Sequence, residues 1–422
     1  MRVAYLTGDF APRICGVCHY TETLAAHVAR AGIEPLILTT RTYAENSSSH
    51  FVRGVTDGWG FDGVIELARF VTNGEIQRVH FQFTAPQSNR FRKRSAMLLL
   101  PVLLALLGWR GQFLTTVHEY YRGVYGEWRL PVFSRSFWGH IHSLLKHIMP
   151  WDKSSGSVLL SSSSIVVSNL VHQAQLVEDL PEIRDRLHLI RVGSNVSILQ
   201  SFQPCRPTTL LRQSKWPDHA VLFGCFGFLN ARKNLDLLLD AFARARYSCP
   251  QIRLLLIGGF HSWWSSQQSE NPLRQRLCAK AAALGISRDV VITGYVEPSV
   301  LSSYLSLLNY GVLPFTDGTT FKSGALVTML QAGIPVIVTA HRPTDVDLER
   351  CPMVVTVPNN DVNSLATAME RCSNGVHERT EVVAASKGIM EEFSWKTIAR
   401  KHIELYQNQD EPEPQSMRTV IA

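Results

Sequence analysis

Short apolar runs separated by longer amphipathic stretches constrain the fold of this chain more than any other feature of its sequence. In Tyr20–Arg30, Leu24, Ala25 and Val28 recur at helical spacing, and Gly32 follows as a stop signal. Six β-branched runs in the first half read as strands: Val3–Thr7, Leu36–Thr40, Val79–Phe83, Phe113–His118, Ile165–Ser168 and Leu187–Val192. This alternation predicts a parallel sheet wrapped by helices.

The same alternation restarts near residue 220, which predicts a second unit of the same kind. Strands are expected at Ala220–Cys225, Arg253–Ile257, Val290–Thr293, Gly311–Phe315, Pro335–Thr339 and Met353–Val357. Helices fit Leu235–Arg246, Pro272–Leu284, Pro298–Leu308 and Lys322–Gln331. Ser201–Thr209 lies between the two halves and has neither period, so we interpret residues 201–209 as an interdomain linker.

The chain is therefore expected to form two Rossmann-like, doubly wound α/β domains, residues 1–200 and 210–394. Residues 395–407 are expected to form a C-terminal helix that packs back towards the N-terminal domain. The Gln-, Glu- and Pro-rich residues 408–422 are expected to be a disordered tail. Open sheets of this kind bind ligands beyond the carboxyl ends of their strands, so we expect the site in a cleft between facing domains.

The charge of the chain indicates an anionic partner. Its 422 residues carry a formal net charge of +7, and 45% are apolar and 18% charged, which argues against disorder. Nucleic acid, anionic lipid and a phosphorylated substrate all fit this charge, but the cations are dispersed and no nucleic-acid module is visible. No signal peptide is recognised, so we expect a cytoplasmic protein whose eight cysteines form no disulfide framework.

The longest apolar run, Ala96–Gly108, is interrupted by Pro101 and is shorter than the roughly 20 residues that span a bilayer. We interpret it as a buried helix or part of a core wall. Because Arg92–Arg94 precede it, peripheral contact with an anionic membrane at the inner membrane face is the alternative.

Two segments carry residues typical of anion binding. In the first, Gly224–Asn234, a strand ends at Gly224 and Gly227, and a short loop presents Arg232 and Lys233 before the next helix. Glycine lets a ligand approach the backbone closely, and two adjacent cations suit a diphosphate. The alternative is an ordinary strand–loop–helix connection with solvated charges.

The second segment, Pro314–Leu326, places a polar, glycine-containing loop between a buried strand and a helix expected to begin near Lys322. The first turn of a helix offers N–H groups and a partial positive charge, which suits phosphate. Ala332–Val336 follows as a tight helix-to-strand turn, which we interpret as structural.

The succession of motifs resembles the retaining glycosyltransferases of family 4. The motifs are Gly-Phe-Leu-Asn-x-Arg-Lys from Gly227, Leu-Leu-Ile-Gly-Gly, Thr-Gly-Tyr-Val, Pro-Phe-x-Asp-Gly and Ala-Gly-Ile-Pro-Val. Together with a glycine-containing first loop and the entry to the last helix at Trp395, they span nearly the whole chain. The resemblance implies a GT-B fold, a nucleoside-diphosphate-sugar donor, transfer to an acceptor hydroxyl with retention, and no required metal or cofactor.

The same resemblance implies roles for individual residues. The donor diphosphate would lie near Gly227, between the cations and helix start formed by Arg232, Lys233, Ser323, Gly324 and Ala325. The first domain would bind a glycan or lipid-linked acceptor, with the backbone of Gly16 against the reacting groups. His118 would point at the donor sugar, although a strand-end histidine with a structural role is the alternative. The apolar, basic stretch before residue 108 suggests cell-surface polysaccharide or glycolipid synthesis.

The chain departs from the family at two acidic positions. Many members have two glutamates, one for the donor sugar and one for the ribose, where this chain has Thr320 and Thr328. A hydroxyl can bond a sugar but cannot offset developing positive charge as a carboxylate does. We therefore expect Asp317 to supply the catalytic carboxylate and Lys322 a phosphate contact. The missing acids leave open a catalytically impaired protein that acts as a nucleotide- or glycan-binding module.

The two cysteines near the N-terminus form a pattern that is also found in redox and haem proteins. Cys15-Gly16-Val17-Cys18-His19 matches thioredoxin-like redox sites and the c-type haem attachment sequence. Haem attachment requires export, which the N-terminus does not indicate. Because the rest of the chain resembles a glycosyltransferase, we interpret this match as coincidence.

Overall fold

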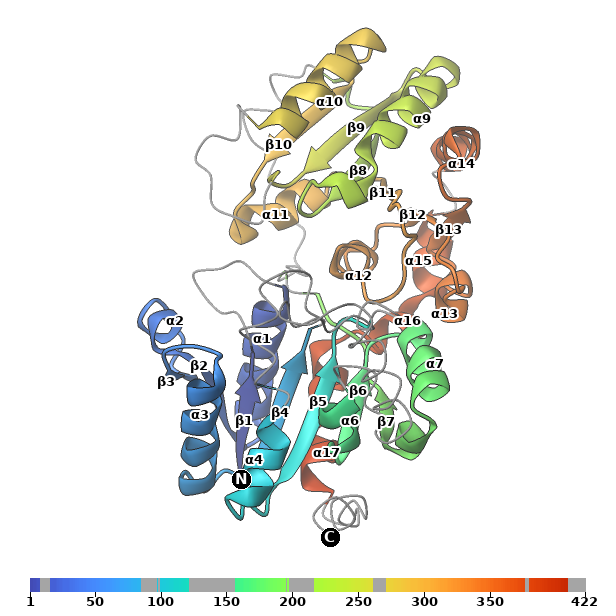
Figure 1. Ribbon diagram of the computed structural model, residues 1–422. Helices are drawn as coiled ribbons and strands as arrows, with labels where there is room; N and C mark the ends of the chain where they lie inside the picture. The colour runs from blue at the N-terminus through green and yellow to red at the C-terminus, as the bar shows by residue number, and fades with distance from the viewer. Residues whose placement is uncertain are drawn as a thin grey trace, which may run out of the picture. The chain divides into compact units, whose positions relative to one another are not determined.

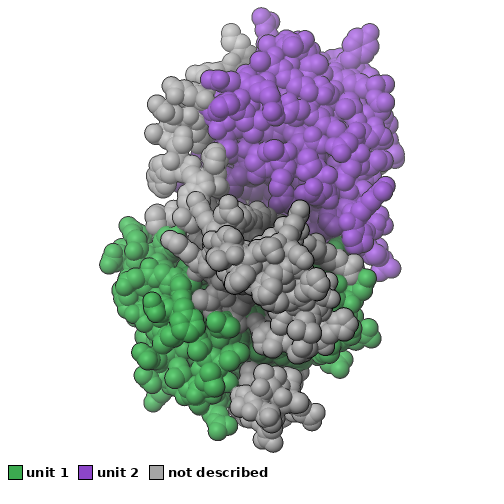
Figure 2. Space-filling view, in the orientation of Figure 1, with its two compact units in different colours: residues 1–190, 398–422 green, residues 191–397 purple. Residues whose placement is uncertain are grey.

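The computed structural model describes residues 1–7, 16–84, 97, 99–120, 156–194, 196, 216–260, 271–375 and 379–408. The chain divides into two compact units, unit 1 with Met1–Ile190 and Ile398–Ala422 and unit 2 with Arg191–Thr397 (Figure 2). Each unit is built on one parallel sheet with helices packed against it (Figure 1). The expected linker at 201–209 and the tail beyond residue 408 lie outside the described residues.

Among the described residues, unit 1 has a seven-stranded sheet in the order β3-β2-β1-β4-β5-β6-β7. Its strands are β1 Arg2–Leu6, β2 Glu34–Thr40, β3 Val52–Thr56, β4 Arg78–Phe83, β5 Gln112–Val117, β6 Ser164–Val167 and β7 Leu187–Leu189. Its helices are α1 Gly16–Arg30, α2 Arg41–Glu45, α3 Phe61–Asn73, α4 Leu100–Leu106, α6 Gly156–Leu160, α7 Leu170–Asp179 and η3 Pro181–Arg186. The strand order reverses between β1 and β4, which marks the topological switch point of a doubly wound sheet.

Unit 2 repeats this plan in the part of it that the structure describes, with a six-stranded parallel sheet in the order β10-β9-β8-β11-β12-β13. Its strands are β8 Val221–Phe226, β9 Ile252–Ile257, β10 Val290–Gly294, β11 Tyr310–Leu313, β12 Val336–Thr339 and β13 Val354–Val357. The helices are η4 Ala231–Lys233, α9 Leu235–Ser248, α10 Pro272–Ala283, α11 Pro298–Leu305, α12 Gly324–Gln331, α13 Val346–Glu349, α14 Val362–Asn374, α15 Arg379–Ala385 and α16 Lys387–Glu391. Helix α17, Trp395–Gln407, begins in unit 2 and belongs to unit 1 from Ile398 onwards. In unit 2 the switch point lies between β8 and β11.

The structure confirms the two-sheet α/β plan, with differences at particular elements. β7 ends at Leu189 rather than Val192. β3 was not expected because Arg53 and Gly54 interrupt its apolar pattern, but its backbone pairs in parallel with β2. The helix expected from Lys322 begins at Gly324, because the Ser323 side chain caps it by accepting a hydrogen bond from the backbone N–H of Leu326.

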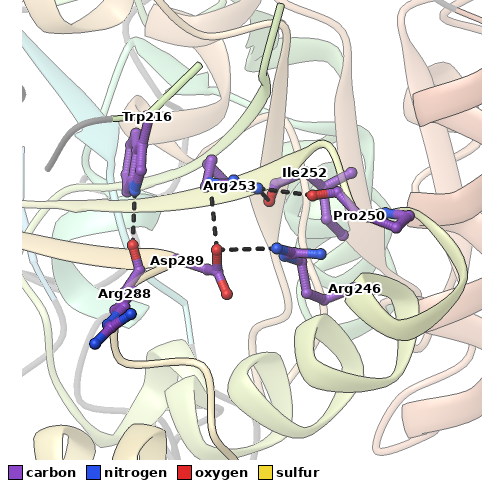
Figure 3. Close-up of polar contacts among 7 residues, drawn as sticks. All are labelled: Trp216, Arg246, Pro250, Ile252, Arg253, Arg288 and Asp289. Carbon is purple, nitrogen blue, oxygen red and sulfur yellow. Dashed lines mark hydrogen bonds and ion pairs between the residues drawn. The ribbon is translucent and has the colours of Figure 1, made fainter.

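A charged cluster joins the amino ends of β9 and β10 (Figure 3). Asp289 precedes β10, and its Oδ1 lies 3.2 Å from Arg246 Nη2 and 3.3 Å from Arg253 Nε. The indole N–H of Trp216 donates to the Arg288 carbonyl at 2.7 Å. These groups lie at the edge of the sheet opposite the carboxyl ends of its strands, so they hold the sheet together away from the switch point.

Helix α17 contributes a buried polar cluster to unit 1, alongside the sheet (Figure 1). The Tyr406 hydroxyl lies 2.7 Å from His80 Nδ1 and 3.1 Å from the Tyr5 hydroxyl. His402 Nδ1 lies 2.9 Å from the Ile398 carbonyl oxygen, and it must donate because a carbonyl only accepts.

This arrangement keeps two histidines neutral. With Nδ1–H committed to a carbonyl, Nε2 of a neutral His402 accepts from the Tyr20 hydroxyl, 3.3 Å away. Burial lowers the pKa of His402 to about 4, and burial together with the charge of nearby histidines lowers the pKa of His80 well below its usual value. The docking of α17 therefore depends on uncharged imidazoles.

We predict that unit 1 loses stability as the pH falls below the pKa of an unfolded histidine. Because the folded pKa of His402 is depressed, the unfolded state binds more protons, and the stabilisation present above pH ~6.5 is lost towards pH ~4. For His402 alone the loss between pH 7.5 and 5 is about 2 kcal/mol. Denaturant unfolding followed over this pH range measures it. His402→Gln should flatten the dependence, and parallel curves for the two proteins would contradict the assignment.

Candidate active site

Two loops meet at the switch point of the unit 2 sheet. The first follows β8 and runs from Gly227 to Asn234, and the second follows β11 and runs from Pro314 to Ser323. The backbone N–H of Thr316 donates to the Arg232 carbonyl at 3.0 Å, which ties the loops together. The structure therefore brings together the two segments that the sequence singled out.

Gly227 lies close to both Lys233 and the start of α12. Its φ of +107° is a conformation that side chains rarely adopt. A Cβ placed there would lie 3.1 Å from Lys233 Nζ and 3.8 Å from Ala325 Cβ. A Cβ on Gly258 would lie only 2.1 Å from the Gly227 carbonyl oxygen. Two glycines thus let the backbone, a cation and a helix start converge.

Lys233 is a cation with a restricted environment. Its side chain is 8% exposed, Nζ donates to the Phe226 carbonyl at 2.7 Å, and Nζ lies 4.4 Å from the centre of the Phe315 ring. Burial lowers the pKa of the Lys233 ammonium. The nearby Cys225 side chain has the opposite, smaller effect, because it favours the charged form of Lys233. An ammonium has three donors, and the Phe226 carbonyl takes one, so Lys233 retains capacity for an anion at Gly227.

The start of α12 supplies backbone donors on the other side of Gly227. Ser323 caps the helix, with its hydroxyl 3.3 Å from the Leu326 nitrogen. Within the described residues, no acceptor is recorded for the N–H groups of Gly324 and Ala325. A Cβ at Gly324 would meet no atom of the described chain within 4 Å. These N–H groups and the helix dipole favour a bound anion.

Arg232 and Asp317 lie at the exposed rim of this site. Arg232 Nη2 is 3.4 Å from Asp317 Oδ2, and the side chains are 57% and 64% exposed. Such a pair contributes little stability, so both groups can exchange this contact for a ligand. The adjacent Gly318 packs tightly, because a Cβ there would lie 2.2 Å from the Ala340 carbonyl oxygen.

Thr320 and Thr328, which the sequence resemblance places where other members have acids, are both buried. The N–H of Lys322 lies 3.4 Å from Thr320 Oγ1, and Thr320 is 7% exposed. Thr328 lies within α12, with Oγ1 2.9 Å from Ser194 Oγ. Their expected contacts with the sugar and the ribose remain predictions, as does the phosphate contact of the partly exposed Lys322.

In unit 1, His118 directly follows β5. Its backbone N–H donates to the Phe83 carbonyl at 2.9 Å, and Nε2 lies 2.8 Å from Gln82 Oε1. The ring packs edge-on against Tyr20, with centroids 5.1 Å apart. Gly16 is the first residue of α1.

Of the two cysteines in the Cys15–His19 pattern, the structure describes Cys18. Cys18 is buried in α1, while Cys15 lies outside the described residues. No group of three or more His, Cys, Asp or Glu side chains within the described ranges could hold a metal ion.

Sequence reasoning missed several contacts at these sites. Phe315 was noted only as part of a motif, and its ring contact with Lys233 depends on how two loops fold. Asp345 is buried and accepts the Phe321 N–H at 3.0 Å, from a loop 24 residues away. The glycine pair in Leu-Leu-Ile-Gly-Gly indicated a close backbone approach at Gly258. The sequence did not predict that Gly227 is the residue approached.

Comparison with known proteins defines the class as GT-B. Sucrose-phosphate synthase from Thermosynechococcus elongatus is 18% identical, with a TM-score of 0.64 over 96% of this chain and 98% of that one. Anabaena HepE in complex with UDP and glucose is 14% identical, with a TM-score of 0.65 over 96% and 99%. WaaG, a glycosyltransferase involved in lipopolysaccharide biosynthesis, is 13% identical, with a TM-score of 0.61 over 96% and 100%.

Residues 220–374 match the family described as Glycosyl transferases group 1. This segment contains both loops at the switch point of unit 2 and the start of α12. A search of curated proteins found no match. The chain thus has a GT-B fold and carries a glycosyltransferase group 1 segment in unit 2.

We predict that Lys233→Met separates stability from anion binding. Methionine fills similar space without a buried charge, so the thermal midpoint should be unchanged or raised. The wild-type midpoint should rise with added inorganic pyrophosphate, and that of Lys233→Met should not. Lys280→Met is the control. Lys280 lies on α10 and pairs with Asp240 of α9, and this variant should respond to pyrophosphate like wild type. An equal response from both variants would remove Lys233 from the anion site.

Proposed function

We propose that this protein transfers a sugar from a nucleoside-diphosphate-sugar to an acceptor hydroxyl, with retention of the anomeric configuration. The observation that carries the proposal is the convergence of Lys233 Nζ and Ala325 on Gly227 at the switch point of unit 2. A buried cation facing a helix start suits a diphosphate, and the family match of residues 220–374 supports a sugar nucleotide as the donor. HepE, which shares the fold, has been solved with UDP-glucose.

In the proposed reaction, the diphosphate is the leaving group. Lys233 and the N–H groups of Gly324 and Ala325 stabilise the negative charge that develops on it, with Arg232 and Lys322 as further cations. Asp317 offsets the positive charge that the sugar acquires, and His118 hydrogen bonds the transferred sugar. The acceptor hydroxyl attacks the face from which the leaving group departs and loses its proton to the departing phosphate oxygen. The proposal requires no metal.

A panel of UDP-, GDP- and ADP-sugars tests this function. The protein is incubated with each donor, alone and with glycan or lipid-linked acceptor extracts, and released nucleoside diphosphate is measured. Release that depends on one base and one sugar is expected. Anomeric configuration of the product, read by proton NMR, tests retention. Absence of both binding and release with every donor would overturn the proposal.

We predict that Asp317→Asn lowers turnover by about 10²-fold while the affinity for the nucleoside diphosphate changes little. The amide keeps the size of the side chain but loses the negative charge that the transition state requires. Because the Arg232–Asp317 pair is exposed, the thermal midpoint should not move. Asp236→Asn, which breaks an exposed pair with Arg276 on the same unit, is the matched control. Unchanged turnover in Asp317→Asn would show that another group supplies the charge.

A second candidate function is a nucleotide- or glycan-binding module without turnover. The burial of Thr320 and Thr328 at the positions of the family's acids favours it. The donor panel separates the two functions, because saturable binding with neither hydrolysis nor transfer is the result expected of a binding module.

We also propose peripheral contact of unit 1 with an anionic membrane. Helix α4 buries Leu100 and Leu104, but it exposes Val102 and Leu106, and Leu106 is 67% exposed. The basic residues 92–94 that precede the run lie outside the described residues. No helix among the described residues is long and apolar enough to cross a membrane. An exposed apolar helix face that follows a basic run in the sequence suits shallow attachment, as a lipid-linked acceptor would require.

We predict that the double variant Val102→Asn, Leu106→Asn binds phosphatidylglycerol-containing vesicles about tenfold more weakly than wild type. Binding of the wild type should fall as salt is raised and should be lost on neutral vesicles. Sedimentation with vesicles measures both effects. Tyr247→Asn removes a 91% exposed aromatic residue from α9 and serves as the control. No wild-type binding at low salt would count against the membrane contact.

A further inference from the structure

A turn directly before α12 is held by a carboxylate from another loop of unit 2. The N–H of Ser323 donates to the Thr320 carbonyl at 3.0 Å and closes the turn, and α12 begins at the next residue, Gly324. Phe321 lies inside this turn, and its backbone N–H donates to Asp345 Oδ2 at 3.0 Å. Because the turn leads straight into the helix, its conformation sets the direction in which the first N–H groups of α12 point.

The side chain of Phe321 anchors the same turn in the core of unit 2. It is fully buried, and its ring centroid lies 4.7 Å from that of Phe393. The Arg191 guanidinium lies 5.4 Å from the centre of the Phe321 ring and also pairs with Asp347, two residues after Asp345. The segment that starts α13 therefore reaches the turn by two routes, through a backbone hydrogen bond and through an arginine.

The loop after β12 also supports the earlier part of the loop that follows β11. The N–H of Thr319 donates to the Thr339 carbonyl at 2.9 Å, and the Thr339 hydroxyl donates to the Phe315 carbonyl at 2.7 Å. These bonds lie at the carboxyl end of β12. Asp345 extends the same support to the residues next to α12, where the candidate anion site lies.

The second oxygen of Asp345 indicates that this residue does more than fill space. Asp345 is 2% exposed, and its Oδ1 has no hydrogen-bond partner among the residues that the structure describes. A buried acceptor without a partner destabilises the folded state, so native structures contain few of them. An apolar side chain at this position would avoid the unmet acceptor but would leave the Phe321 N–H unpaired. The arrangement thus favours the bond to the turn over the local stability of the carboxylate.

We propose that Asp345 is a positioning residue for the diphosphate, because it holds the turn that aims the first N–H groups of α12. Those groups belong to Gly324 and Ala325, and Ala325 lies beside Gly227. This inference rests on the proposed function, since it assigns a further residue to the same donor site. Asp345 does not touch the ligand and acts through the backbone of Phe321.

The first test measures the affinity of wild type, Asp345→Ala and Asp345→Asn for inorganic pyrophosphate by titration calorimetry, well below the thermal midpoint of each protein. Asp345→Ala has no acceptor for the Phe321 N–H, so its dissociation constant should rise about tenfold. Asp345→Asn keeps an acceptor oxygen, so its affinity should stay within about threefold of wild type. A purely structural role would lower the thermal midpoint of Asp345→Ala and leave the affinity of the folded protein unchanged.

Asp289→Ala is the matched control. It removes a carboxylate of the same unit that is 15% exposed and paired with Arg246 and Arg253, at the edge of the sheet opposite the candidate site (Figure 3). It should lower the thermal midpoint and leave the affinity for pyrophosphate as in wild type. Wild-type affinity in Asp345→Ala, or an equal loss of affinity in Asp289→Ala, would overturn the proposal.

Amide hydrogen exchange tests the same coupling without a variant. If Asp345 links the Phe321 N–H to the anion site, pyrophosphate must in turn strengthen this bond, because coupling is reciprocal. The exchange of the Phe321 N–H in wild type should therefore slow when pyrophosphate is added, by a larger factor than that of Leu254. The Leu254 N–H donates to the Asp289 carbonyl at 2.9 Å and reports any general stabilisation of unit 2. Equal slowing of both amides, or no binding of pyrophosphate, would contradict the role of Asp345.

Both tests are independent of turnover, so they separate this proposal from the proposed function. The expected affinities and exchange rates with no turnover on any donor would leave Asp345 as assigned and reject the enzyme. Turnover with unchanged exchange at Phe321 would keep the enzyme and reject the role of Asp345.

Discussion

The direct parallel pairing of β8 with β11 is the constraint on which the candidate donor site depends. Because the strand order reverses between them, the chain leaves the two strands in different directions and opens a crevice at their carboxyl ends. The loop after β8 carries Gly227 and Lys233, and the loop after β11 leads to the start of α12. Gly258, which follows β9, packs against the Gly227 carbonyl and holds the first loop in place.

Burial lowers the pKa of His80 and His402 in unit 1 and of Lys233 in unit 2, but the contacts around these groups differ. His80 and His402 are deeply buried and have no carboxylate partner among the residues that the structure describes, so they remain neutral and hold α17 by hydrogen bonds. Lys233 is nearly as buried, but the Phe226 carbonyl and the Phe315 ring both favour its charged form. A bound diphosphate would favour it further, since it brings the opposite charge.

Thr320 and Thr328 stand where the sequence resemblance places two glutamates, and the structure shows what holds Thr328. Thr328 is buried in α12 and hydrogen bonded to Ser194, so its hydroxyl serves the packing of unit 2. Asp317 is the acidic group that stands exposed at the rim, paired only loosely with Arg232. In the reaction proposed above, Asp317 would supply the negative charge that offsets the sugar's cationic character.

The sequence by itself determined the two-sheet architecture, because the strand and helix periods are local properties that tertiary packing did not override. It also singled out Lys233 and the loop before α12 as a candidate anion site, since glycines, adjacent cations and a helix start lie close together along the chain. Only the tertiary structure decided that Gly258 supports Gly227, that Phe315 lies under Lys233, and that Gln82 holds His118. These contacts join residues far apart in sequence or in different loops, and they depend on strand pairing and loop folding, which local patterns do not encode.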